Sequence, residues 1–164
     1  MKKNIYMSLA VALVSVVTLC FTACGDDDEK DMTKPVISDK GITANPIDCQ
    51  TYHRGDVIAF NYVFEDDTEL GSFNIEIHNN FEHHTHSTST TECEDEDEHE
   101  HHQPVKPWVF NQDYQIPAGQ KNYTARFDIQ IPADIDEGDY HFMVRLTDRA
   151  GWQELKGIAI KIEE

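Results

Sequence analysis

A segment rich in histidine and acidic residues interrupts the chain between two predicted strands. Residues 82–102 hold six of the nine histidines and eight acidic residues. Imidazole is the commonest neutral ligand for divalent transition metals, and carboxylates attract cations and can complete a coordination shell. The composition therefore predicts a metal-binding insert, and the alternative is a solvated acidic loop that binds no ion.

The segments on either side of this insert show the period-two alternation of β-strands, with one apolar and one more polar face. Helical periodicity is absent after the N-terminal leader. About seven short strands in one domain predict an all-β fold, an immunoglobulin-like (Ig-like) sandwich, with a small barrel as the competing architecture. The expected strands lie near 36 and over 57–65, 71–78, 107–112, 122–131, 139–148 and 154–163. In the letters of the Ig fold, the insert (82–104) is then a long C–D insert, disordered or semi-ordered, in a domain spanning 35–164.

The alternating directions of the strands gather the remaining histidines at one end of this sandwich. His53 precedes the second strand, His78 ends the third, and His141 begins the sixth. His78 and His141 are out of phase with their apolar neighbours, so both should lie on the outer face of one sheet, close together across neighbouring strands. The insert leaves from the same end of the domain.

Three or four imidazoles around one point would suit Zn²⁺, with Cu²⁺ and Ni²⁺ as alternatives. Histidines two residues apart on an extended segment point to the same side, as His84 and His86 would. Each histidine also has an ordinary reading, as an exposed strand or loop residue, and the last three of the insert would collect ions only weakly. The candidate ligands, in order of preference, are His78, His86 and His141, then His53, His84 and His83, with Glu82 as a candidate carboxylate.

The first 23 residues are typical of a lipoprotein signal peptide. Two lysines precede an almost unbroken apolar run over 5–21. Small residues then precede Cys24, and the tetrapeptide resembles a lipobox, although leucine is more usual in place of Phe21. We therefore expect Cys24 to carry the lipid (palmitate), and an ordinary signal peptide is the alternative.

Residues 24–34 predict a short, charged and flexible tether. Their acidic run resembles the surface-export signal of Bacteroides-type lipoproteins. We therefore expect an outer-membrane protein that contacts the membrane through its lipid anchor only. The resemblance implies that the domain faces the cell surface, and the periplasmic face is the alternative.

Net charge excludes one class of partner and favours another. The chain has a formal charge of −18, and loss of Lys2 and Lys3 with the leader leaves 11 basic against 31 acidic residues, a charge of −20. Nucleic acid is a poor partner for such a surface, because its phosphates would be repelled. Cations are good partners, and a divalent metal ion is the expected ligand.

Two cysteines, Cys49 and Cys93, remain in the mature chain. Outside the cytoplasm, two cysteines in a small domain predict a disulfide. A pair of thiolate metal ligands is the alternative, which an oxidising compartment disfavours.

Several stretches together resemble a known family. Residues 138–152 (GDYHFMVRLTDRAGW) are similar to the sixth strand and following turn of bacterial Ig-like domains. With 53–55 (HRG), 75–81 (IEIHNNF), 84–86 (HTH) and 138–142 (GDYHF), the chain resembles an uncharacterised family, a domain of unknown function, of Bacteroides-type lipoproteins with an Ig-like domain and a His-rich insert. The resemblance covers about 34–164 and implies fold and localisation, but no activity.

Three functions follow from these features. The first is metal scavenging, buffering or delivery to an outer-membrane transporter. The second is a glycan- or protein-binding module in which the insert only solubilises, with Trp108, Trp152 and Tyr114 as a candidate aromatic platform. The third is a metalloenzyme, but no motif with catalytic spacing is present, so we expect no enzymatic activity.

Overall fold

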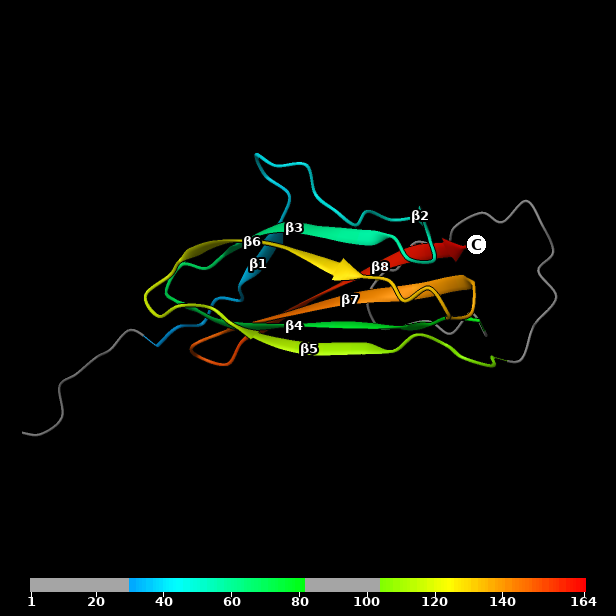
Figure 1. Cartoon of the computed structure of the whole chain (residues 1–164). Helices are drawn as coiled ribbons and strands as arrows, with labels where there is room; N and C mark the ends of the chain where they lie inside the picture. Colours follow the sequence, from blue (N-terminus) through cyan, green and yellow to red (C-terminus); the bar gives the residue numbers. More distant parts are fainter. Residues whose placement is uncertain (1–29, 82–103) are drawn as a thin grey trace, which may run out of the picture. The chain divides into compact units, whose positions relative to one another are not determined.

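The computed structural model describes residues 30–81 and 104–164. All regular secondary structure in these residues is β-strand (Figure 1). Alternation of apolar and polar residues explains most of these strands, because each buries one face. The strands are β1 (Val36–Ser38), β2 (Gln50–His53), β3 (Val57–Glu65), β4 (Leu70–Asn79), β5 (Phe110–Gln115), β6 (Asn122–Gln130), β7 (Gly138–Asp148) and β8 (Gln153–Glu163).

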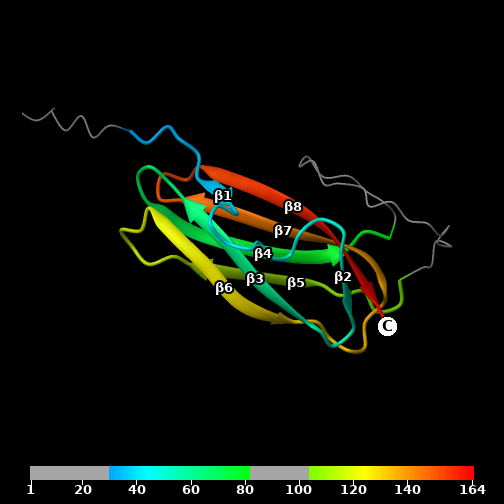
Figure 2. The same ribbon diagram turned by 90° about the horizontal axis from the view of Figure 1, so that it is seen from above.

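The strands form two separate sheets that face each other (Figures 1 and 2). The three-stranded sheet has the order β1-β3-β6, and the five-stranded sheet has the order β2-β8-β7-β4-β5. The predicted all-β, Ig-like sandwich is confirmed. The competing barrel is wrong, because the two sheets do not join into one closed sheet within the described residues.

Aromatic side chains from both sheets fill the interior. The ring of Phe60 on β3 lies 5.0 Å from that of Phe127 on β6, 6.5 Å from Phe73 on β4 and 5.8 Å from Phe142 on β7, centroid to centroid. These spacings are the favourable range for aromatic pairs. The two sheets are therefore held together by direct contacts between their inward-facing residues.

Two strands differ from the predictions. β2 was not expected, because only Tyr52 of its four residues is buried, and it pairs parallel with the distant β8. β5 begins at Phe110 rather than at 107. Trp108 lies before the strand and is buried. β5 also pairs with β4 in the five-stranded sheet, so it is not the D strand of the opposite sheet, and the polar sequence of β5 gave no indication of its partner.

The two ends of the sandwich carry different chemistry. At the insert end, on the right of Figure 1, β4 ends and β5 and β7 begin; we define it by residues 76–81, 104–108 and 134–141. At the opposite, aspartate end lie the β3–β4 turn (66–69) and the β7–β8 turn (148–152).

Tyr140 joins three segments at the insert end. Its hydroxyl donates to the carbonyl of Asp136 at 2.7 Å and accepts a hydrogen bond from the backbone N–H of Trp108 at 3.2 Å. Its ring meets that of Phe81 edge-on, with centroids 5.4 Å apart. This arrangement is the tyrosine corner of Ig-like sandwiches. It fixes the chain both where the insert leaves the domain and where it returns.

Replacing Tyr140 with phenylalanine should lower the free energy of unfolding by about 1–3 kcal/mol, because the Trp108 N–H loses its buried acceptor. Urea denaturation followed by fluorescence measures the change. The matched control is Tyr123→Phe on β6, whose side chain is only half-buried. Equal effects of the two substitutions would show that the Tyr140 hydroxyl has no special role.

Candidate functional site

His78 and His141 lie side by side on the outer face of the five-stranded sheet. They are directly paired residues of β4 and β7, and their ring centroids are 5.5 Å apart at an interplanar angle of 88°. Both rings point away from the interior because their strand neighbours, such as Ile77 and Phe142, are fully buried on the inner face. The predicted adjacency of these two histidines is confirmed.

Neither histidine is an ordinary exposed strand residue. His141 is only 3% exposed, and the side chain of His78 is 18% exposed. Met143, two residues along on the same face of β7, is also buried. The two imidazoles are therefore largely shielded from solvent, although they lie on the outer face of the sheet.

Glu76 adds a carboxylate to the pair. It lies two residues before His78 on the same face of β4, and its Oε1 is 3.3 Å from Nδ1 of His78. A carboxylate beside one ring nitrogen favours the tautomer with its proton there, so that the other nitrogen presents its lone pair. The two atoms are in electrostatic contact without forming a hydrogen bond, so Glu76 is placed to act on the His78 imidazole through its charge.

The spacing of the two rings suits a shared ion. With Zn–N bonds of about 2.0–2.1 Å, two imidazoles on one tetrahedral zinc have ring centroids roughly 5 Å apart. The observed 5.5 Å is close to this value.

His53 shares the end of the sandwich but does not join the pair. It pairs with Glu163 of β8, whereas His141 pairs with Ala159. Four residues along a strand correspond to about 13 Å, too far for one ion. Its exposed ring lies 3.5 Å from Asp56 instead. The expected convergence of His53 was wrong, because residues at the same end of a sandwich need not share a register.

The other candidate residues lie outside the described part of the chain, so their roles stay predictions. In residues 30–81 and 104–164, no third histidine, cysteine or carboxylate forms a compact ligand group with His78 and His141. The residues that lie outside are Glu82, His83, His84, His86, His99, His101 and His102, together with Cys24 and Cys93.

Cys49 lies in line with the histidine pair across the sheet. It is disulfide-bonded, and its backbone N–H donates to the carbonyl of Ala159 at 2.8 Å. Ala159 in turn is the residue of β8 that pairs with His141. The other three cysteines of the chain fall outside the described residues, so the predicted partner, Cys93, remains a prediction.

Both flanks of the insert are fastened beside the histidines. On the outgoing side, the N–H of Asn80 donates to the carbonyl of Asp139 at 2.7 Å. The Phe81 ring then lies against Gly138, where any Cβ would come within 2.9 Å of it. On the returning side, one carboxylate oxygen of Asp136 accepts the backbone N–H groups of Val105 and Lys106. The described residues on both sides of the insert are therefore held to the sandwich.

Sequence reasoning missed Glu76 and Asp136. Period-two alternation places Glu76 on the same face as His78, so the signal for Glu76 was present in the sequence. Asp136 gave no such signal, because its partners, the N–H groups of Val105 and Lys106, lie about thirty positions earlier in the sequence.

Comparison with family models assigns the chain to a family. The sandwich, with its tyrosine corner and long insert, defines an Ig-like domain of the type predicted. The chain belongs to the family "Domain of unknown function (DUF4625)", whose model matches residues 22–163. This confirms the resemblance to an uncharacterised domain family. No helix among the described residues is long and apolar enough to cross a membrane.

One solved structure is similar at low identity. It is the crystal structure of Spo0M, a sporulation control protein from Bacillus subtilis, with 11% identity and a TM-score of 0.41. The alignment covers 81% of this chain and 51% of that chain, so the match spans about half of the length of Spo0M. The comparison with curated proteins gives no match.

Proposed function

We propose that this protein is a lipid-anchored outer-membrane protein that binds a divalent transition metal, with zinc as the first candidate and copper or nickel as alternatives. The observation that carries the proposal is the secluded, register-paired couple of His78 and His141, with rings 5.5 Å apart. Glu76, 3.3 Å from Nδ1 of His78, supports it as an outer-shell carboxylate.

Two imidazoles need further ligands to hold zinc tightly, since structural and catalytic zinc sites have three or four protein ligands. We assign these further ligands to His86 and His84 of the insert. The residues on both sides of the insert are held at the end of the sandwich where the histidine pair lies. The remaining acids and histidines of the insert would raise the cation concentration near the site and bind ions weakly. Such a protein would scavenge or buffer metal, or deliver it to an outer-membrane transporter.

Titration calorimetry with zinc on the full chain, freed of metal by chelation, tests the site. We expect one component with a Kd tighter than micromolar and a weaker component from the insert. Replacing both His78 and His141 with alanine should remove the tight component only. His53→Ala, at the same end but outside the pair, is the matched control and should change neither.

Binding should also weaken as the pH falls below about 6.5, because protonated imidazole cannot ligate a metal. A chain with no component tighter than micromolar would contradict the proposal. So would a double variant that keeps its circular dichroism spectrum and its tight binding.

The disulfide of Cys49 should connect to Cys93 and hold the insert near the histidines. Peptide mapping by mass spectrometry under non-reducing conditions should find this linkage. Replacing both cysteines with serine should weaken the tight zinc component about tenfold, because the ligands of an untethered loop lose more conformational freedom on binding. A free Cys93 thiol in the exported, lipid-anchored protein would refute this disulfide assignment.

Localisation depends on Cys24. Cells expressing the full chain should incorporate labelled palmitate into it and retain it in the outer-membrane fraction. Cys24→Ala should abolish both the label and the retention, while Cys20→Ala, in the same leader, should keep them. Outer-membrane retention of the Cys24 variant would rule out the predicted anchor.

A further inference from the structure

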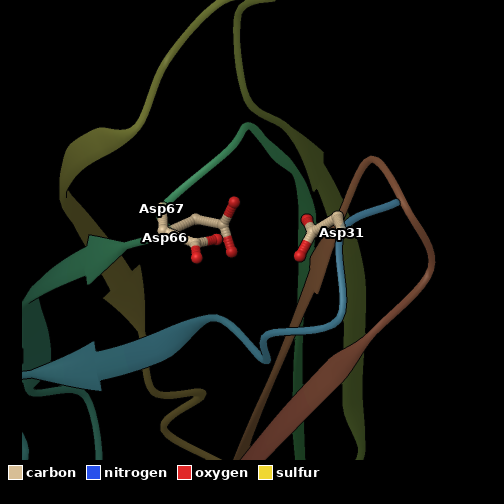
Figure 3. Close-up of side chains that lie close together, drawn as sticks. All are labelled: Asp31, Asp66 and Asp67. Carbon is tan, nitrogen blue, oxygen red and sulfur yellow. The ribbon is translucent and has the colours of Figure 1, made fainter. Parts of the chain in front are cut away.

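A second group of ligand-type side chains lies at the aspartate end, away from the histidines. Asp31, Asp66 and Asp67 point their carboxylates toward one another (Figure 3), and one oxygen of each lies within 4.8 Å of the others. Asp31 precedes β1, whereas Asp66 and Asp67 form the turn between β3 and β4. Segments distant in the sequence thus place three negative charges together.

Both oxygens of Asp67 accept hydroxyl hydrogen bonds, Oδ2 from Thr33 at 2.8 Å and Oδ1 from Thr68 at 3.3 Å, whereas the fold uses only part of the Asp31 and Asp66 carboxylates. Asp66 Oδ1 accepts the backbone N–H groups of Thr68 and Glu69, at 2.9 and 2.7 Å. Asp31 Oδ1 accepts the N–H of Thr33 at 2.9 Å. Among donors in the described residues, none reaches Asp31 Oδ2 or Asp66 Oδ2, and both atoms are buried. Two oxygens in the cluster are therefore desolvated without a partner.

Asp148, at the end of β7, extends the same group. It is 4% exposed and is paired with Leu70, just after the turn that holds Asp66. Its Oδ1 accepts the backbone N–H groups of Gly151 and Trp152, at 2.6 and 2.8 Å, while Oδ2 is buried and has no donor in the described part of the chain. Burial first, and then the charges of Asp66 and Asp31, raise the pKa of Asp148.

Two basic side chains in this region bind groups other than these carboxylates. Lys121 Nζ donates to the main-chain carbonyl of Asp67 at 2.7 Å, and Arg149 Nε lies 3.3 Å from Glu69. Within residues 30–81 and 104–164, no lysine or arginine forms an ion pair with any of the four aspartates. Buried carboxylate oxygens without a donor or a cation are energetically costly. A bound cation would remove this cost.

We propose that Asp31, Asp66, Asp67 and Asp148 bind a calcium ion. Ca²⁺ takes six to eight oxygen ligands at about 2.3–2.6 Å, so two oxygens on one ion lie at most about 5 Å apart. One oxygen each of Asp31, Asp66 and Asp67 meets this limit. Mg²⁺ needs a tighter octahedron and keeps several waters, whereas zinc prefers nitrogen and sulfur. The ion would fasten Asp31, which lies in the predicted tether (24–34), to the two turns of the domain.

The test uses the full chain after chelation, titrated with CaCl₂ and followed by calorimetry and by tryptophan emission. The indole of Trp152 donates to the carbonyl of Asp31 at 3.0 Å, so its emission should report binding. We expect a Kd of about 10⁻⁵ to 10⁻³ M, the range from calcium sensors to extracellular modules. Calcium should also raise the melting temperature more than magnesium does at equal ionic strength.

Asp148→Asn and Asp66→Asn separate a calcium site from an acidic surface. Asparagine keeps the Oδ1 acceptor of each turn, so both variants should fold. Each should bind calcium at least about tenfold more weakly. Without calcium, each should melt at a higher temperature than the parent chain, because the repulsion among carboxylates is reduced.

Asp128→Asn, an equal change of charge at an exposed position on β6, is the matched control and should leave calcium binding intact. The double histidine variant should do the same, and the aspartate variants should leave zinc binding unchanged, so the two sites fail or hold separately. Equal melting shifts from calcium and magnesium, or equal effects of the Asp148 and Asp128 substitutions, would overturn the calcium site.

Discussion

The buried hydroxyl of Tyr140 is the interaction on which the insert end depends. It joins the loop before β7, through the carbonyl of Asp136, to the returning chain at Trp108. Its ring holds Phe81, the last described residue before the insert. Because successive side chains of a strand point to opposite faces, an inward Tyr140 forces His141 outward. The same residue therefore stabilises the fold and orients the histidine beside it.

The two ends of the sandwich offer cations different ligands. The insert end presents imidazoles with a carboxylate behind one of them, which suits zinc and related ions. The aspartate end presents oxygen atoms alone, which suits calcium. A net charge of −18 attracts cations to the whole molecule without distinguishing them. If both proposed sites bind their ions, selectivity comes from local donor chemistry, and the fold keeps the two donor sets apart.

The sequence predicted those features that repeat locally and missed those that depend on distant segments. The bounds of β3 were predicted to the residue, and those of β6 and β7 within one residue, because each strand buries one face. The pairing of His78 with His141 followed from strand phase and the neighbouring of two strands in the Ig fold. β2 and the partner of β5 could not be read, since short or polar strands carry no clear alternation.

The same distinction explains the two sites. His53 was misplaced because the parallel pairing of β2 with β8 sets its register, and nothing in the local sequence encodes that offset. The aspartate group was not predicted at all. Asp31 was assigned only to the tether (24–34), and Asp66 and Asp148 were not among the candidate site residues. Their convergence depends on the contact of three segments up to 117 positions apart in the sequence.

Strand β7 contributes to both ends, with His141 near its start and Asp148 as its last residue. Seven residues of extended chain separate them by about 23 Å, too far for a direct interaction across a strongly screening solvent. Five of the six residues between them are buried or half-buried in the centre of the five-stranded sheet. We expect a strand paired on both sides to move as a body with its neighbours, without a second arrangement that an ion at one end could select. Coupling between sites requires such a two-state element. The two ions should therefore add independently to the stability of the fold, each through its own affinity.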